Sequence, residues 1–221
     1  MKIKKYLNPI NYINKIRRPL ILKKFRRQNK NTDFTIISQN CIGGVIYANL
    51  GLEFRTPTIN MFIEDENFVK LVENFEYYMN IPAVIKTEFF VDPIDSNIKY
   101  PVIAVGDIEM HCLHYHSGEE AVNAWERRRK RVNFNNVFVI GNSWNSHEKP
   151  EIIDRIANSK YKTVIFTYDS YKTKNCIELK GDKWKKDKRN IVRPNLTDKI
   201  PNSPYRQFEK IFDFVKWLNE K

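Results

Sequence analysis

Acidic residues are absent from the first thirty-two positions of this sequence, whereas eleven lysines and arginines lie between Lys2 and Lys30. Without that segment, 38 − 11 = 27 basic residues face 26 acidic ones, although the whole chain carries a formal charge of +12. The excess positive charge therefore belongs to one segment and not to the whole surface. We expect a basic N-terminal arm over residues 1–31 and a single domain over residues 32–221.

Cysteine and glycine are both scarce, and long apolar runs are missing. The three cysteines, Cys41, Cys112 and Cys176, show neither the paired spacing of a zinc site nor the even count of a disulfide framework. Seven glycines among 221 residues argue against collagen-like or low-complexity sequence. No apolar run approaches the roughly 18 residues that cross a bilayer, and the N-terminus lacks the apolar core of a secretory signal. We expect a cytoplasmic protein.

Apolar and aromatic residues alternate with the cations of the basic arm, and Pro9 and Pro19 are predicted to break it into short pieces. Such a segment can lie in the headgroup region of an anionic membrane, where each cation contributes about 1 kcal/mol. The alternative is a solvated, partly disordered arm. Nucleic acid is not expected, because the rest of the chain adds no excess of positive charge. The chain is expected in the cytoplasm, either free or at the inner face of the cell membrane.

Short apolar runs alternate with helical patterns from Thr32 onward. Strands are predicted over residues 34–38, 58–63, 83–90, 100–105, 137–140 and 163–167. Helices are predicted over residues 45–49, 65–81, 117–131, 149–158 and 208–218. Strands separated by helices favour right-handed crossovers. The fold class is therefore α/β, with three layers: a mostly parallel sheet and helices on both of its faces.

The end of the first predicted strand carries the segment Asn40-Cys41-Ile42-Gly43-Gly44. Ligands of open α/β sheets bind beyond the carboxyl ends of the strands. Two glycines let the backbone approach a ligand closely, and the following helix directs free N–H groups to the same point. We expect Asn40, Gly43 and Gly44 to bind ligand and Cys41 to be a thiol of depressed pKa. The alternative is that Cys41 is a small buried hydrophobe and the glycines serve only the turn.

Histidines gather near a second predicted strand end. His111, His114 and His116 lie close to Asp107 in the sequence. An imidazole base beside a cysteine is the arrangement that activates a thiol for acyl transfer. We expect Cys41 as the nucleophile, His114 or His111 as the base and Asp107 as the group that orients it. The alternatives are ordinary polar contacts and a metal site, for which no recognised ligand spacing is present; no metal is expected.

A run of five cations, Arg127 to Arg131, ends the helix predicted over residues 117–131. The helix macrodipole partly explains such a run, since it favours positive charge at a C-terminus. Arg128, with Trp125 on the same inward side, and Arg131 are candidates for binding phosphate or carboxylate, because arginine makes bidentate contacts and an aromatic ring can stack. Asn142, at a further strand end, is expected to add a polar group to the same rim. The alternative is a solvated helix face.

Several short motifs together resemble a bacterial family known as domain of unknown function nineteen-nineteen, often described as exopolysaccharide biosynthesis proteins. They are Asn40 to Gly44, Tyr100-Pro101 before Asp107, His114-Tyr115 followed by Glu119-Glu120-Ala121 and Trp125, and the arginine-rich run that ends at Asn133. The resemblance covers about residues 33–169 and implies a role in capsule or exopolysaccharide biosynthesis. The Asn40-Cys41 step is also similar to the Gly-Asn-Cys step of a coenzyme A-binding capsule-biosynthesis family thought to acetylate sugars, although Gln39 stands where that family has glycine.

These observations lead to two hypotheses of different classes. The first is a surface-polysaccharide enzyme that transfers an acetyl group from acetyl-coenzyme A to a hydroxyl of a sugar or lipid-linked sugar. Coenzyme A or acetyl-coenzyme A would then be the cofactor. The second is a non-catalytic module that binds a sugar or nucleotide sugar and recruits other polysaccharide enzymes to the membrane.

Overall fold

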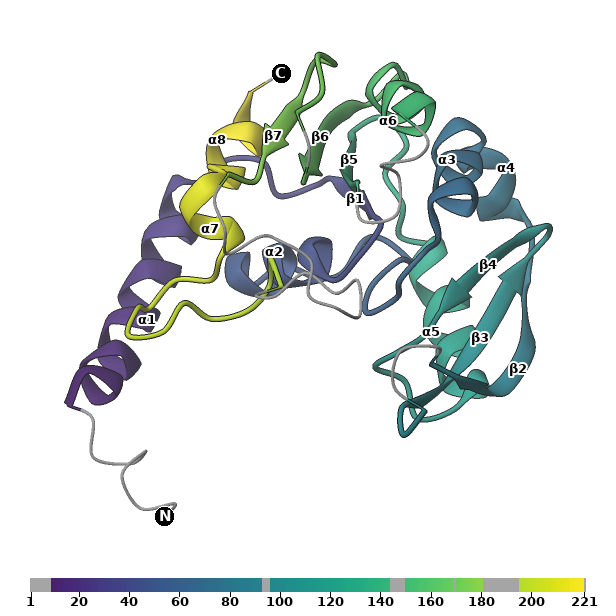
Figure 1. The fold of residues 1–221 in the computed structure, drawn as a ribbon, viewed down its shortest axis with the longest axis horizontal. Coiled ribbons are helices and arrows are strands. Elements are labelled where there is room, and N and C mark those ends of the chain that lie inside the picture. Colours follow the sequence, from purple (N-terminus) through teal and green to yellow (C-terminus); the bar gives the residue numbers. More distant parts are fainter. Residues whose placement is uncertain (1–8, 93–95, 144–149, 169, 181–194, 221) are drawn as a thin grey trace.

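The computed structural model describes residues 9–92, 96–143, 150–168, 170–180 and 195–220 (Figure 1). The helices are α1 (Pro9–Gln28), α2 (Ile42–Leu50), α3 (Asp65–Glu73), α4 (Phe75–Asn80), α5 (Gly118–Arg129), α6 (Pro150–Ala157), α7 (Phe208–Ile211) and α8 (Phe214–Asn219). The strands are β1 (Thr35–Ser38), β2 (Ala83–Val91), β3 (Lys99–Val105), β4 (Ile108–His111), β5 (Val137–Asn142), β6 (Lys162–Thr167) and β7 (Cys176–Glu178).

The central sheet is parallel and has the strand order β1-β5-β6-β7. Its strands are short and almost wholly buried, as expected for a sheet that is covered on both faces. Successive residues point to opposite faces, so Ile36 belongs to one apolar cluster and Ile37 to the other. Helices α2, α7 and α8 cover the first face, and α3, α5 and α6 contribute to the cluster on the second. The predicted three-layer α/β fold is confirmed.

Strands β2, β3 and β4 form a second sheet, which is antiparallel and separate from the first. The strands predicted over residues 83–90 and 100–105 are therefore confirmed as strands, but they pair as a hairpin. Gly106 has a φ of 59° in the turn between β3 and β4, a left-handed conformation that glycine adopts without strain. The residues around Asp107 thus form a hairpin turn and not the carboxyl end of a parallel strand.

The prediction of a strand over residues 58–63 is wrong, because this segment is a turn followed by a single bridge between Phe62 and His111. Its groups nevertheless replace a strand at the edge of β1. The hydroxyl of Thr58 accepts a hydrogen bond from the Ser38 N–H at 3.2 Å. The Ile63 N–H donates to the Gln39 carbonyl at 3.1 Å. The segment therefore connects the end of β1 with β4 in the second sheet.

Helix α1 is continuous from Pro9 to Gln28, so the prediction that prolines break it into pieces is wrong. Pro9 is its first residue, where a missing N–H costs nothing, and contacts on both sides of Pro19 hold the helix to the rest of the chain. Arg18 makes two hydrogen bonds to the Glu209 carboxylate, at 2.6 and 2.8 Å, and a third to Asn49. Phe25 packs edge-on against Phe214. In Figure 1, α1 and the second sheet lie at opposite ends of the molecule.

The Arg18–Glu209 ion pair is the central contact of α1. The carboxylate of Glu209 is fully buried and also accepts from the Asn49 amide and the Arg206 N–H, whereas the Arg18 side chain is 24% exposed. Replacing Arg18 by Met leaves that carboxylate buried without its cation, and we expect the free energy of unfolding to fall by about 3 kcal/mol. Urea denaturation measures the change.

The matched control is Arg17→Met, one position away on an exposed part of the helix, which should change stability by less than about 0.5 kcal/mol. Equal denaturation midpoints for the two variants would show that the ion pair does not hold α1 in place.

Candidate functional site

Two neighbouring strands of the parallel sheet send the chain to opposite faces. After β1 the chain enters α2, whose Ile42 and Ile46 lie in the cluster on one face. The next described helix after β5 is α6, whose Ile152 and Ile156 lie in the cluster on the other face. Ligands of open α/β sheets bind where neighbouring connections diverge in this way. The carboxyl ends of β1 and β5 are therefore the candidate ligand edge.

A buried polar network occupies this edge. The side-chain amide of Gln39 donates to the carboxylate of Asp65 in α3, and its oxygen accepts from the Asn142 N–H at 2.9 Å. The main chain of Gln39 also bonds to Ile140 and Ile63. Gln39 has no exposed surface, and Asn142 and Asp65 are 2% and 6% exposed. We call Gln39, Asp65 and Asn142 the edge network. Its members join β1, β5 and α3. Asn142 takes part through its main-chain N–H, and its contact with a ligand stays a prediction.

The residues predicted to cradle a ligand at the start of α2 are used in local packing. The Asn40 side chain accepts from the Ile42 N–H at 3.0 Å, and the Ser38 hydroxyl accepts from the Gly43 N–H at 3.2 Å. A Cβ on Gly43 would lie 2.8 Å from the Ser38 Cβ, so glycine is needed for close approach of α2 to β1. The alternative interpretation, that the glycines serve the turn, fits these contacts better than the predicted ligand cradle.

Cys41 lies immediately before α2 and is half-buried. The prediction that the helix terminus depresses its pKa is wrong: burial raises the pKa of the Cys41 thiol to about 11. At neutral pH the sulfur is therefore protonated. A thiol in that state reacts slowly unless a base lies beside it.

Asp107 does not meet a histidine. One carboxylate oxygen accepts from the Tyr78 hydroxyl and the other from the Lys70 ammonium, each at 2.7 Å, and these bonds lower the pKa of Asp107. His111 lies four residues further along β4, which is about 13 Å of extended chain. The structure thus gives Asp107 a place in a surface ion pair in the β3–β4 turn and does not support the predicted orienting role.

The two candidate bases are separate from Cys41 in their contacts. His111 is half-buried among the rings of Phe62, Phe90 and Tyr100, and this burial lowers its pKa. His114 is exposed. Within the described ranges, neither imidazole makes a hydrogen bond to Cys41. The structure does not assemble the predicted Cys–His pair.

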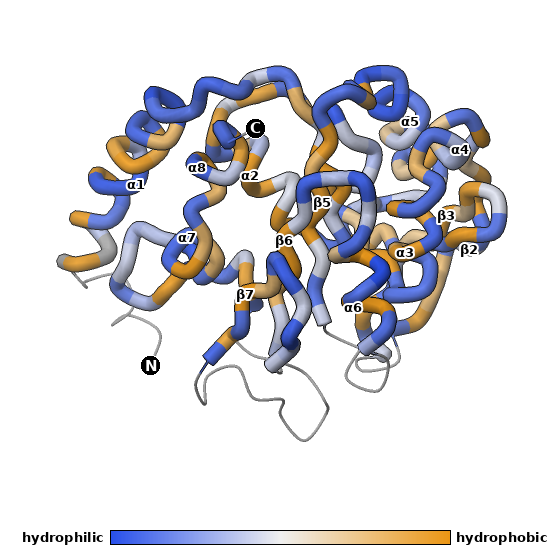
Figure 2. Tube along the Cα trace, turned by 90° about the horizontal axis from the view of Figure 1, so that it is seen from above, coloured by the Kyte–Doolittle hydropathy of each residue, from blue (hydrophilic) through white to orange (hydrophobic). Residues whose placement is uncertain are grey.

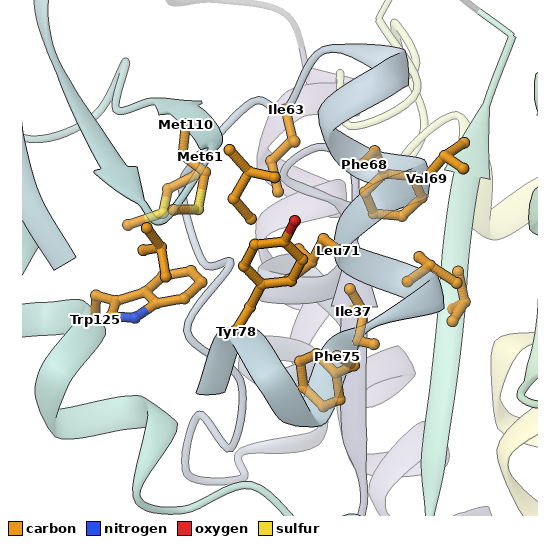
Figure 3. Packing of buried hydrophobic residues seen from close by; sticks show 14 of the residues in the cluster. Ile37, Met61, Ile63, Phe68, Val69, Leu71, Phe75, Tyr78, Met110 and Trp125 are labelled. Carbon is orange, nitrogen blue, oxygen red and sulfur yellow. The ribbon is translucent and has the colours of Figure 1, made fainter. Parts of the chain in front are cut away.

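Trp125 is part of the core. It has no exposed surface, and Figure 3 shows it beside Met61 and Met110. Its indole N–H is buried without a hydrogen-bond partner. The prediction that Trp125 stacks on a ligand is therefore wrong for this conformation, because its helical position faces the second sheet.

Arg128 differs from the other cations of its run. Its guanidinium donates to the Tyr115 hydroxyl at 2.6 Å and lies 5.4 Å from the centre of the Phe54 ring. That hydroxyl donates in turn to the Ile59 carbonyl at 2.8 Å. The Ile59 side chain lies 3.4 Å from where a Cβ on Gly44 would stand. Arg128 is thus linked to the first turn of α2 through Tyr115 and Ile59.

The neighbouring arginines are already paired. Arg129 bonds to Glu126 and to the Met79 carbonyl, and Arg131 forms an ion pair with Glu53 at 3.2 Å. Arg128 is half-buried and, in the part of the chain that the structure describes, has no carboxylate within ion-pair distance. Among the predicted anion-binding residues, Arg128 is therefore the one that the structure leaves suited to a ligand.

Sequence reasoning did not single out Tyr115 or the edge network. Tyr115 appeared only within a family motif. Its role in the site depends on a hydroxyl that bonds to both Ile59 and Arg128, which lie far apart in the sequence. Asp65 is the first residue of α3, whose N-cap is Glu64, and its side chain is turned inward to Gln39. Over the described ranges, no group of three or more His, Cys, Asp or Glu residues is placed to hold a metal ion.

Comparison with known proteins identifies the family. The family model described as "Domain of unknown function (DUF1919)" matches residues 12–219, nearly the whole chain. The chain therefore belongs to this family. It is also similar to an uncharacterized protein of Haemophilus influenzae (strain ATCC 51907 / DSM 11121 / KW20 / Rd), with 28% identity over 210 residues that cover 94% of each chain. The match begins at residue 12, within α1, so most of the basic helix lies within the family domain.

The two glycines of α2 give a matched pair of variants. Gly43→Ala places a methyl group against the backbone-anchored Ser38 and Ile36, at 2.8 and 3.2 Å. We expect it to lower the free energy of unfolding by about 1–3 kcal/mol. Gly44→Ala meets Ile59 only at an ordinary 3.4 Å, and alanine favours the helix, so stability should be unchanged or rise by up to about 1 kcal/mol. Thermal unfolding followed by circular dichroism separates the two; equal losses would contradict the packing role of Gly43.

The pKa of Cys41 predicts its reactivity. Because the thiolate is the reactive form, alkylation of Cys41 by iodoacetamide should rise about tenfold per pH unit from pH 7 and show no plateau before about pH 11. Peptide-resolved mass spectrometry follows Cys41 separately from Cys112 and Cys176. A plateau near pH 8 would mean that a neighbouring group activates the thiol after all.

Proposed function

We propose that this protein acts in surface-polysaccharide biosynthesis by binding a phosphate-bearing sugar precursor, a nucleotide sugar or a lipid-linked sugar, beside the first turn of α2. The carrying observation is the half-buried guanidinium of Arg128, which contacts Tyr115 and Phe54 and has no carboxylate partner among the described residues. The polysaccharide pathway is supported by the resemblance of the sequence to proteins described as exopolysaccharide biosynthesis proteins.

The chemistry of Arg128 supports a phosphate ligand. A partly desolvated cation is costly unless an anion or several hydrogen bonds compensate it. The Tyr115 hydroxyl accepts a hydrogen bond from one of the five N–H groups of Arg128. This bond fixes the orientation of the planar guanidinium. The remaining donors match the oxygens of a phosphate or pyrophosphate, and the centre of the Phe54 ring lies 5.4 Å from the guanidinium carbon.

Recognition is favoured over covalent catalysis by the state of Cys41. Its thiol is protonated at neutral pH, Asp107 is bonded to Lys70 and Tyr78, and His111 lies among aromatic rings. We therefore favour the hypothesis of a module that binds the precursor and brings other polysaccharide enzymes to it.

Sugar O-acetylation is the second candidate, in a form without an acyl-cysteine. The sugar hydroxyl would attack the thioester carbonyl of acetyl-coenzyme A, the carbon–sulfur bond would break, and the hydroxyl proton would pass to the coenzyme A sulfur. One observation favours it: the half-buried Cys41 lies at the start of the same helix whose first turn borders Ile59, the residue that accepts a hydrogen bond from Tyr115. The pyrophosphate of coenzyme A would use the same guanidinium.

Replacing Arg128 by Gln tests both candidates. Loss of a charge-assisted contact to phosphate is worth about 2 kcal/mol, so affinity should fall about thirtyfold. Calorimetric titration with UDP-glucose, undecaprenyl phosphate and coenzyme A measures it, after a thermal-shift screen selects the probe that stabilises the protein. Stabilisation by coenzyme A supports acetyl transfer, whereas stabilisation by the sugar nucleotide or lipid phosphate supports the binding module.

The matched control is Arg127→Gln, which removes the same charge from an exposed neighbouring position. It should leave the affinity within about twofold, because an exposed charge is screened by solvent. An equal loss of affinity in both variants would mean that the ligand responds only to the net charge at the end of the helix. If the wild-type protein bound none of the probes, the proposal would be refuted.

A further inference from the structure

Helix α1 has apolar residues on two sides, and only one side is covered. The covered side holds Arg18 and Phe25, which contact Glu209 and Phe214. The other side carries Ile13, Ile16 and Leu20, which are 49%, 58% and 63% exposed. These three residues follow the i, i+3, i+7 spacing of one helical stripe, and that stripe lies opposite Arg18 and Phe25. We call Ile13, Ile16 and Leu20, with the exposed Tyr12, the outward stripe.

Exposed cations share the outer side of the helix. Arg17, Lys23, Lys24 and Arg27 are all exposed, and by helical geometry they flank or continue the outward stripe. The first thirty-two residues of the chain contain no acidic residue. Figure 2 shows the alternation of hydrophobic and hydrophilic positions along α1. This side of the helix therefore complements a surface that is both anionic and apolar beneath its charges.

The rotation of the helix is set by the folded protein. The two hydrogen bonds from Arg18 to Glu209, the bond from Arg26 to the Asn49 carbonyl and the Phe25–Phe214 contact all lie on the covered side. A free basic peptide would fold only on contact with its partner, and it would lose affinity to the entropy of ordering. Here the helix is ordered before binding, and its apolar side chains already point outward.

We propose that α1 is a preformed membrane-docking helix, which lies in the plane of an anionic lipid surface with the outward stripe among the acyl chains and its cations at the headgroups. A phosphate-rich nucleic acid would use the cations but not the exposed isoleucines and leucine. No helix within the described ranges is long and apolar enough to span a bilayer, so the mode of attachment is peripheral. The inference is independent of the ligand that Arg128 takes.

Vesicle co-sedimentation of the full chain tests the proposal. We expect binding to vesicles of phosphatidylglycerol and phosphatidylcholine and little binding to phosphatidylcholine alone. Ile16→Asn with Leu20→Asn removes apolar surface at constant charge, and Lys23→Gln with Lys24→Gln removes two cations. Each pair should lower the partition coefficient about tenfold or more, because a cation near such a surface contributes about fivefold and a buried aliphatic side chain at least as much.

Matched controls lie elsewhere on the surface. Ile98→Asn with Leu113→Asn removes two exposed apolar side chains far from α1 in the sequence, and Lys172→Gln with Lys174→Gln removes two exposed cations. Both should bind vesicles as the wild type does, and all variants should keep the wild-type melting temperature. Arg128→Gln should also bind vesicles normally, which separates this inference from the proposed ligand site.

Three results would overturn the proposal. Unchanged binding by the Ile16/Leu20 pair would mean adsorption through charge alone, without insertion of the stripe. Equal loss in the Lys172/Lys174 control would mean a response to net charge. Equal binding to both kinds of vesicle, or to neither, would show that the helix does not recognise an anionic lipid surface.

Discussion

The buried amide of Gln39 is the contact on which the arrangement of the site depends. Its main chain closes the end of β1 against β5 and the 58–63 segment, and its side chain joins β5 to α3 through Asn142 and Asp65. The parallel sheet, helix α3 and the connection to the second sheet therefore meet at one residue without exposed surface. A shorter or apolar side chain here would leave the Asp65 carboxylate and an N–H of β5 buried without these partners, which costs more than the hydrogen bonds contribute when formed. The edge network thus stabilises the carboxyl edge of the sheet. The polar atoms that form it bond to one another, so they are not the groups that we propose for a ligand.

The sequence predicted the fold class because local patterns and tertiary structure agree in the parallel sheet. Residues 34–38, 137–140 and 163–167 are short apolar runs between turn residues, and all three form buried parallel strands. The sequence did not predict that the second sheet is separate from the first. A strand in a hairpin and a strand before a crossover can have the same apolar run, because the two differ only in the path of the chain between the strands. Gly106-Asp107 was read as a strand end for this reason, and the error carried Asp107 and the nearby histidines into a catalytic hypothesis that their contacts do not support.

The candidate site was predictable in kind but not in detail. The cationic run from Arg127 to Arg131 indicated anion binding, but the sequence could not separate five similar charges. Their different fates depend on partners far away in the chain: Glu53 for Arg131, Met79 for Arg129, and Tyr115 with Phe54 for Arg128. The glycines and Cys41 show the opposite problem. Their motif predicted a ligand-binding turn with a reactive thiol. In the structure, close packing on β1 explains Gly43, and desolvation raises the pKa of Cys41. Burial disfavours the charged thiolate, so the pKa of Cys41 is raised although the residue directly precedes a helix.

Helix α2 relates the proposed membrane helix to the proposed ligand site. Near its C-terminal end, Asn49 and Gly51 contact Arg18 and Arg26 of α1. Its first turn, at Gly44, borders Ile59, whose carbonyl accepts a hydrogen bond from Tyr115, and Tyr115 in turn accepts one from Arg128. Nine residues of helix span about 13 Å, so α2 is a rigid link between its contacts with α1 and its contact with Ile59. A receptor that attaches to lipid through α1 fits a lipid-linked sugar better than a free nucleotide sugar, because a soluble ligand would need no attachment of its receptor to lipid. The rigidity of α2 therefore gives a physical reason why one family domain should include both the basic helix and the guanidinium.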